Sequence, residues 1–467
     1  MNNILLVDFG STYTKITLVD IEKEIILGHE QSWTTIDKDV RIGLTNAISI
    51  LEEKIGKFSF NKCIACSSAA GGLRMLVSGL VPSLTAEAAK RASLGAGAKI
   101  IKTYSYGLTK YDVEEIFKLE PDIFLLAGGT DGGNSECVIN SAKILSANKK
   151  DNKLFPIIIA GNRRATDEAY DILNTAGYET FKCENVMPSL GELKVEEVQE
   201  CIRNVFIRNI VKAKGLDKAE DEITGVVLPT PLAVMEGIKL LSLGTKEETG
   251  LGELVAIDVG GATTDIYSIA KGDPTKGSTV LKGLKEPFCK RTVEGDIGMR
   301  YSIHGILNAS NDNEISEISG LSEEFVTNRI EEFSKNTDLV PQNEEDEKLD
   351  IALAKVASKV ALKRHSGELK EYYTCMGISY MQYGKDLENV RTMVLTGGSL
   401  IHTKKSVEIA SYATYKQTDP FSLRPKECEV YVDRKYIIAS MGLLSKQYPN
   451  IALRILKKEL IKDGITK

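Results

Sequence analysis

Two short segments combine aspartate, glycine and threonine at the same spacing, a composition suited to holding phosphate groups. The first reads LVDFGSTYTKITLV (residues 6–19) and the second AIDVGGATTDIYSI (residues 256–269). Aligned without a gap, Asp8 of the first corresponds to Asp258 of the second, 250 residues later, and glycine and threonine positions also match. A single such turn is common for conformational reasons alone. Two copies in register indicate a shared chemical task.

That task is expected to be the binding of a nucleoside triphosphate from two sides. Glycine lets backbone N–H groups approach phosphate oxygens closely, and an aspartate at a strand end can hold hydrated Mg²⁺. Asp8 and Asp258 are therefore the expected metal ligands and catalytic carboxylates, and Lys15 would neutralise phosphate charge. The other expected phosphate-binding residues are Gly10, Ser11, Thr12, Thr14, Gly260, Gly261, Thr263 and Thr264.

Two further glycine-rich strand ends add candidate residues. The strand predicted in Asp122 to Gly129 runs into GGTDGG, where Asp131 could orient an attacking water by accepting its hydrogen bond; an ordinary Asx turn is the alternative. The strand predicted in Arg391 to Leu400 ends in Gly397, Gly398 and Ser399. These three residues are expected to contact adenosine, the alternative being a strand exit that only needs glycine.

Rival sites have weaker support in the sequence. It contains no G-x-x-x-x-G-K-[ST] and no G-x-G-x-x-G after a strand, which argues against Walker-type and dinucleotide sites. Cys63 and Cys66 form one CxxC with no second copy or nearby histidine, so a four-ligand zinc site is incomplete. Buried structural cysteines on opposite faces of a strand are the favoured interpretation.

Each repeated segment predicts a β-hairpin, because an apolar run ends in Asp, crosses a turn and resumes with alternating polarity. A third strand is expected after each, at Glu24 to Gln31 and at Ser278 to Lys282. Alternating strand and helix patterns follow, which indicates an α/β protein. The expected helices are 40–55, 85–98, 112–119, 192–213, 322–333 and 346–364, and Pro156 to Asn162 is a further strand.

Length and composition bound the whole chain. The 467 residues suit two or three domains, and we expect one at 1–205 and another at 206–467 with a helical insertion around 310–390. A net charge of −6 gives no overall attraction to nucleic acid or anionic membranes. The first apolar run, Ile4 to Val7, is too short for a signal peptide, and no run long enough to span a membrane occurs. A cytoplasmic location is expected.

These segments resemble those of a known superfamily. VDFGSTYTKI resembles the first phosphate loop, AIDVGGATTDIY the second and VLTGGSL the adenosine loop of the proteins that unite actin, heat-shock chaperones and sugar kinases. The sequence is still more similar to the accessory proteins encoded with glutamate (methylaspartate) mutase, a MutL-like family unrelated to mismatch repair. The segments that carry this closer resemblance are DFGSTYTK, CSSAAGGLRM, LLAGGTDGGN, IDVGGATTDI, TVEGDIGMR and LTGGSL.

The resemblance implies two actin-like (ribonuclease H-like) domains, each a mixed sheet flanked by helices, with ATP and Mg²⁺ in a cleft between them. It implies a chaperone-like, ATP-driven factor that reactivates an adenosylcobalamin-dependent aminomutase. Three alternatives stay open: a small-molecule kinase of the same superfamily, a filament-forming actin relative, and an activator of hydroxyacyl-CoA dehydratases with a cysteine-bound iron–sulfur cluster. Homo-oligomerisation is also left open, and neither nucleic acid nor a membrane is an expected partner.

Overall fold

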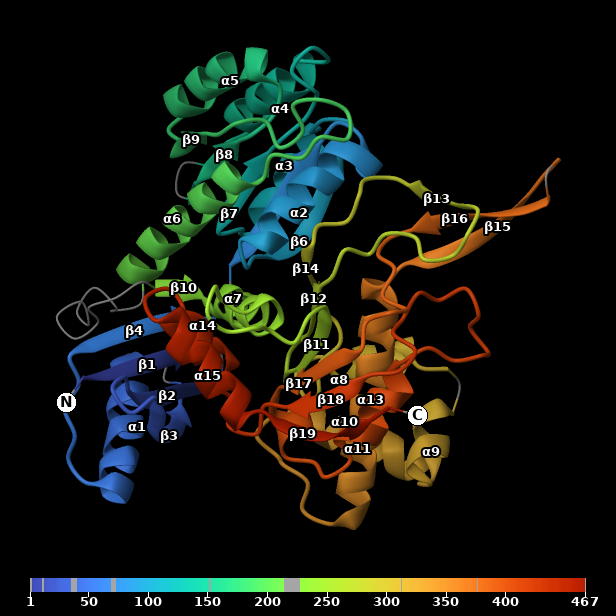
Figure 1. Ribbon diagram of the computed structural model, residues 1–467. Helices are drawn as coiled ribbons and strands as arrows, with labels where there is room; N and C mark the ends of the chain where they lie inside the picture. Colours follow the sequence, from blue (N-terminus) through green and yellow to red (C-terminus); the bar gives the residue numbers. More distant parts are fainter. Residues whose placement is uncertain are drawn as a thin grey trace. The chain divides into compact units, whose positions relative to one another are not determined.

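The chain folds as two compact units, residues Met1–Val234 and Met235–Lys467. The computed structural model describes residues 2–10, 12–34, 40–68, 73–150, 153–213, 227–311, 313–375 and 377–466 (Figure 1). We expected a boundary near residue 205, whereas the contacts divide the chain at Val234. The difference arises because β10 (Val227–Pro229) pairs with a strand of the first unit.

The main sheet of the first unit has five strands in the order β10-β4-β1-β2-β3. They are β1 (Asn3–Phe9), β2 (Tyr13–Asp20), β3 (Ile25–Trp33) and β4 (Lys62–Ser67), together with β10. Strand β2 is antiparallel to both its neighbours, and the other pairs are parallel. If the five strands are numbered 1 to 5 in chain order, they lie side by side as 3-2-1-4-5. This is the order expected for an actin-like, ribonuclease H-like domain. Helix α1 (Val40–Ile55) packs on β2 and β3.

A second sheet is inserted between β4 and β10, and all its strands are parallel. Its order is β6-β5-β7-β8-β9, which in chain order is the doubly wound pattern 2-1-3-4-5. The strands are β5 (Arg74–Gly79), β6 (Lys99–Ser105), β7 (Ile123–Leu126), β8 (Ile157–Ile159) and β9 (Thr180–Lys182). The sequence analysis predicted the strands at β7 and β8 but not that they belong to a sheet of their own.

Helices cover the inserted sheet, as the figure shows (Figure 1). They are the π-helical turn η1 (Pro82–Ala86), α2 (Glu87–Gly95), α3 (Lys110–Leu119), α4 (Glu136–Ala147) and α5 (Arg163–Thr175). Strands β7 and β8 are buried along their whole length, as parallel strands covered on both faces must be. Helix α6 (Glu196–Ala213) then leads back toward β10.

The second unit repeats the main sheet of the first. Its order is β14-β12-β11-β17-β18-β19, with the same antiparallel hairpin and parallel neighbours at its centre. The strands are β11 (Leu254–Val259), β12 (Thr264–Ile269), β14 (Cys289–Glu294), β17 (Thr392–Thr396), β18 (Glu429–Val432) and β19 (Ile461–Ile465). Only the antiparallel β19 extends the 3-2-1-4-5 pattern.

One expectation about this sheet is wrong. The predicted third strand, Ser278 to Lys282, is β13 (Thr279–Lys282), and β13 pairs with β16 (Gly377–Tyr383) in a small separate sheet. The third strand of the main sheet is β14, which pairs with β12. Both β13 and β14 have strand-like sequences, so the sequence pattern alone could not decide which of them pairs with β12.

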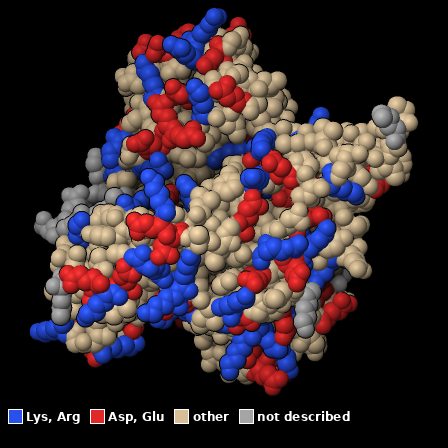
Figure 2. Space-filling view, in the orientation of Figure 1, with Lys and Arg blue, Asp and Glu red and all other residues tan. Residues whose placement is uncertain are grey.

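The small sheet, β13-β16-β15, is completed by β15 (Glu368–Thr374). Figure 2 shows few charged side chains toward its tip, where Tyr373 is 81% exposed and Ile378 is 48% exposed. Part of the segment expected to be a helical insertion therefore forms strands.

Helices α11 (Glu344–His365), α12 (Gly398–Ile401) and α13 (Ser406–Ala413) pack on the main sheet of the second unit. Helix α11 packs on β11, β12 and β14, and its apolar residues form one core with the strands. The others are α7 (Thr230–Leu243, which spans the boundary), α8 (Ile303–Ala309), α9 (Glu314–Ser319), α10 (Glu323–Lys335), α14 (Ile438–Leu444) and α15 (Pro449–Glu459). Among the described helices, none is long and apolar enough to cross a membrane.

Candidate nucleotide site

The two repeated hairpins turn in the same way. The backbone N–H of Gly10 donates to the carbonyl of Tyr13 at 3.0 Å, and that of Gly260 donates to the carbonyl of Thr263 at 2.9 Å. A Cβ on residue 10 would lie 2.6 Å from the Tyr13 carbonyl oxygen, so this tight turn needs glycine. Each unit thus presents one glycine turn directly after the aspartate of its central strand.

Asp8 is held by three neighbours within the first unit. The Thr230 hydroxyl donates to Asp8 Oδ1 at 2.6 Å, and the Cys66 thiol donates to the same oxygen at 3.4 Å. Lys15, opposite Asp8 in the β1–β2 register, places its ammonium 3.8 Å from Asp8 Oδ2. Burial and the charge of Asp8 raise the pKa of Cys66 well above its usual value. The thiol therefore stays protonated and remains a donor.

Thr230 was not predicted from the sequence, and Cys66 was assigned only a structural role. Thr230 follows the short strand β10, and its partner Asp8 lies 222 positions earlier. The only local signal is the strand-like VVLPT, which ends in a hydroxyl residue at a strand end. Cys63 and Cys66 are both buried, as the sequence indicated.

Asp258 lies on β11 in different surroundings. In the β11–β12 register it stands opposite Asp265, at the position that Lys15 occupies in the first unit. Asp265 is 8% exposed and forms a 2.6 Å ion pair with Arg291, which is 6% exposed. The Thr263 hydroxyl donates to Asp265 Oδ2 at 3.1 Å. Although burial opposes it, the carboxylate of Asp265 raises the pKa of Arg291 above its usual value.

The expected adenosine loop contacts Asp258 directly. Strand β17 runs parallel to β11, with Thr396 opposite Asp258. Gly397 has φ +93°, and a Cβ there would lie 2.4 Å from the Val259 carbonyl oxygen and 2.7 Å from Asp258 Oδ1. Gly398 and Ser399 begin helix α12. The structure thus brings the second phosphate turn and the Gly397 loop together within one unit.

The segment TVEGDIGMR folds back onto the second glycine turn. The N–H of Met299 donates to the carbonyl of Gly260 at 3.0 Å, and the N–H of Arg300 donates to that of Gly261 at 2.8 Å. Earlier in the segment, Glu294 pairs with Arg364 at 2.5 Å. The two backbone hydrogen bonds hold the turn against residues 299 and 300.

The threonines of the two turns differ in their surroundings. Thr14 and Thr264 are fully buried; Thr14 shares a hydrogen bond of 3.1 Å with Thr34, while the Thr264 hydroxyl has no hydrogen-bond partner among the described residues. Thr12 is half-buried, as is Thr263. Ser11, also expected to contact phosphate, lies outside the described residues.

Asp131 lies on the inserted sheet, after β7, whereas Asp8 lies on the main sheet. Its Oδ1 accepts hydrogen bonds from the N–H of Arg163 at 3.0 Å and from the side-chain amide of Asn185 at 2.9 Å. Asn162, which is fully buried, holds the same loop by donating to the Gly133 carbonyl at 3.2 Å. The carboxylate is therefore fixed by residues that follow β8 and β9.

Asp8 and Asp258 each carry the kind of oxygen donor that Mg²⁺ prefers. Among the described residues, no group of three or more His, Cys, Asp or Glu side chains is arranged to hold a metal ion. Mg²⁺ does not need such a group, because it keeps several waters and binds through one or two carboxylates together with substrate phosphates. Asp8 and Asp258 offer carboxylate oxygens of this kind.

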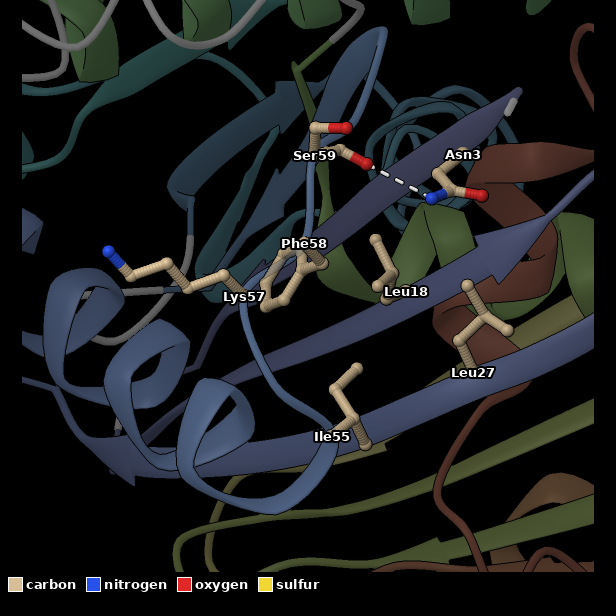
Figure 3. Close-up of a pocket in the computed structure, with 7 residues that line it drawn as sticks. All are labelled: Asn3, Leu18, Leu27, Ile55, Lys57, Phe58 and Ser59. Carbon is tan, nitrogen blue, oxygen red and sulfur yellow. Dashed lines mark hydrogen bonds between the residues drawn. The ribbon is translucent and has the colours of Figure 1, made fainter.

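A pocket of about 450 Å³ lies at the other end of β1 (Figure 3). It is lined by Asn3, Leu18, Leu27, Ile55, Lys57, Phe58 and Ser59. The Asn3 side chain donates to the Ser59 carbonyl at 3.0 Å. Since Asn3 begins β1 and Asp8 lies near its end, this apolar pocket is not part of the phosphate turn.

Sequence comparison identifies the family. The family model described as MutL protein matches residues 4–460. The chain belongs to the MutL protein family. A relative described as Protein MutL, from Clostridium tetanomorphum, is 47% identical over 464 residues, which cover 99% of this chain and all of the relative.

Solved structures give more distant likenesses to this MutL family member. An activator of 2-hydroxyisocaproyl-CoA dehydratase from Clostridium difficile, with bound ADPNP, is 11% identical with a TM-score of 0.34, covering 98% of this chain and 97% of that one. Xylulose kinase from Lactobacillus acidophilus is 11% identical, with a TM-score of 0.39 and coverage of 100% and 94%. A diol dehydratase-reactivating factor in nucleotide-free form is 11% identical, with a TM-score of 0.35 and coverage of 96% and 99%.

Proposed function

We propose that this protein binds and slowly hydrolyses Mg·ATP and serves as an accessory, reactivating factor of an adenosylcobalamin-dependent aminomutase of the glutamate mutase type. The observation that carries the nucleotide part is the repetition of one aspartate–glycine hairpin at the centre of two sheets with the same strand order. The choice of client is supported by membership of the MutL family. This family resembles the accessory proteins encoded with that mutase.

In this proposal the chain's own residues divide the work of nucleotide binding. The N–H groups of Gly10 and Gly260 donate within their own turns, so other backbone N–H groups of these turns would donate to phosphate oxygens, as in other glycine-rich turns. Lys15 neutralises phosphate charge, and the loop at Gly397 contacts adenosine. Asp8 and Asp258 would hold Mg²⁺, directly or through its waters. When bound, this ion would neutralise charge that develops on the phosphates.

Hydrolysis requires a group that orients water toward the terminal phosphate. Asp8, Asp258 and Asp131 are the proposed candidates, since each carries a carboxylate that can accept a hydrogen bond from water. Asp8 Oδ1 accepts hydrogen bonds from Thr230 and Cys66. Asp8 Oδ2 instead forms the ion pair with Lys15. Binding and hydrolysis would then give the protein two states with different affinity for the mutase, which any such switch requires.

The nucleotide part is tested by ligand-induced thermal stabilisation. At a ligand concentration 100 times the Kd, binding stabilises the folded state by about 2.7 kcal/mol. Mg·ATP should therefore raise the Tm of the wild-type protein, and Asp8→Asn or Asp258→Asn should each abolish the rise. Asp167→Asn is a matched control, because Asp167 is an exposed residue that pairs with Lys182. An unchanged response in both site variants would remove these carboxylates from the site.

The accessory role is tested by ATP turnover with and without the mutase. Slow hydrolysis without an acceptor, accelerated by mutase carrying damaged cobalamin, is the expected result. ATP-dependent recovery of mutase activity should accompany it. Stoichiometric phosphorylation of a small metabolite would instead establish a kinase. If the mutase neither accelerates ATP hydrolysis nor recovers its activity, it is not the client, although nucleotide binding could still hold.

A further inference from the structure

Helix α6 and the end of strand β9 face each other through a series of side-chain contacts in the first unit. The N–H of Glu184 donates to Glu197 Oε2 at 2.9 Å. One turn further along α6, Cys201 lies beside Cys183, near enough for the two thiols to shift each other's pKa. Both cysteines are free thiols in this structure.

A third contact continues the series. The guanidinium carbon of Arg208 lies 4.8 Å from the ring centroid of Phe181, and Arg208 pairs with Glu179 at 3.0 Å. Residues 197, 201 and 208 share one face of α6 by helical periodicity. Phe181 and Cys183 share one face of the extended chain for the corresponding reason. The two thiols are therefore held by ordered contacts on both sides.

The two cysteines differ in exposure and acidity. Cys183 is 8% exposed, whereas Cys201 is half-buried. The neighbouring Cys183 thiol lowers the pKa of Cys201, and the positive charge of Arg208 acts in the same direction. The same contact, together with burial, raises the pKa of Cys183. Because the thiolate is the reactive form, Cys201 is the first site of attack and Cys183 is the partner beside it.

We propose that Cys183 and Cys201 are a redox-modification site that forms a reversible intramolecular disulfide when the protein meets a peroxide. The Cys201 thiolate attacks one peroxide oxygen of H₂O₂, the O–O bond breaks, and after protonation the products are a sulfenic acid and water. The Cys183 sulfur then displaces the sulfenic hydroxyl as a second water, and the S–S bond forms. One peroxide is reduced for two thiols oxidised.

The disulfide would act on the connection between the two sheets of the first unit. Helix α6 is the crossover element between the parallel strands β4 and β10 of the main sheet, while β9 belongs to the inserted sheet. A Cβ on Gly95 of α2 would lie 2.2 Å from Gln199 Nε2, so α6 also packs closely on the inserted layer. The covalent link would fix the first half of α6 against the edge of that layer.

The experiment is peptide mapping of the full-length folded protein after peroxide treatment. Lys182, Lys194 and Arg203 place the two cysteines on different tryptic peptides, which only the disulfide can hold together. The expected result is a cross-linked 183–194/195–203 pair that dithiothreitol separates. Cys201→Ser and Cys183→Ser should each abolish this pair, and Cys137→Ser should retain it, because Cys137 is a half-buried thiol on helix α4 of the same layer.

The proposal is overturned if folded protein gives Cys201 sulfinic acid without the cross-link, or if the cross-link forms only in denaturant. Because a serine at a buried position can reduce stability, the Tm of each variant is measured first. Cys201→Ala then provides a second substitution, which must also lack the cross-linked peptides. This readout does not depend on ATP or on a mutase, so its failure leaves the proposed function untouched.

Discussion

Asp8 and Asp258 occupy equivalent turns but have unlike cross-strand neighbours. Lys15 faces Asp8 with an ammonium group, while Asp265 faces Asp258 with a second carboxylate already paired to Arg291. Positive charge thus lies beside the first aspartate, and two acidic groups lie beside each other in the second unit. The surroundings of Asp8 therefore suit phosphate oxygens, and the carboxylate beside Asp258 suits a cation.

Thr230 provides a test at the scale of one residue. Its hydroxyl donates to Asp8 Oδ1 at 2.6 Å, and a hydrogen bond to a charged group contributes about 1.5–3 kcal/mol. Thr230→Val should therefore weaken Mg·ATP binding by about tenfold or more, as measured by titration calorimetry, whereas Thr230→Ser should bind nearly as well as the wild type. Equal affinity in the valine variant would show that this hydroxyl does not position Asp8 for the nucleotide.

At the scale of elements, Gly397 and its neighbour Gly398 form a natural pair for comparison. Residue 397 has φ +93°, and a Cβ there would lie 2.4 Å from the Val259 carbonyl oxygen. A Cβ on residue 398 would meet nothing within 4 Å. Gly397→Ala should destabilise the folded protein by about 1–3 kcal/mol from backbone strain alone, with more from the contact. Gly398→Ala should be close to neutral. Urea unfolding of both variants measures the difference, and equal stabilities would contradict the close packing of β17 on β11.

The sequence predicted the elements whose evidence is local. Both hairpins, the long helices and the short glycine-ended strands lie where their periodicity placed them, because each pattern is complete within a few residues. The pairing of β13 away from the main sheet was missed, since any amphipathic strand satisfies the same pattern whichever partner it has. The inserted sheet was missed for a similar reason: strand order depends on contacts distant in sequence.

The candidate site shows the same division. Asp8, Asp258 and their glycines could be predicted because the two copies identify each other within one sequence. Thr230 and Arg291 could not, because their roles depend on partners 222 and 26 positions away. The contribution of Asp131 remains a prediction, and the structure adds that Asn162 and Asn185 hold its loop.

At the scale of the folded molecule, a buried histidine couples stability to pH. His365 is fully buried at the end of α11, with its ring nitrogens 2.8 Å from the hydroxyls of Thr292 and Ser268. Burial and the nearby charge of Lys290 lower the pKa of His365 well below its usual value. Below the ordinary histidine pKa, His365 is therefore protonated in the unfolded chain but stays neutral in the folded one. The free energy of unfolding consequently decreases as the pH falls.

The loss should begin near the ordinary histidine pKa of about 6.5 and reach at most about 1.4 kcal/mol per pH unit below it. His365→Gln keeps one hydrogen-bonding side chain but removes the titration. Urea unfolding between about pH 7.5 and 5.5 should show a steeper decline for the wild type than for this variant. Equal declines in the two proteins would mean that groups other than His365 cause the loss of stability at acid pH.

The placement of the inserted sheet has a consequence for how the protein can be dissected. The chain leaves the main sheet after β4 and re-enters the crossover at α6, so the order of the five main strands does not depend on what lies between. A shortened protein that passes directly from Ser67 to Val195 through a designed linker would keep every strand pairing of the ribonuclease H-like layer. The larger doubly wound layer is therefore an accessory module in the topological sense, attached at the strand end that borders Asp8.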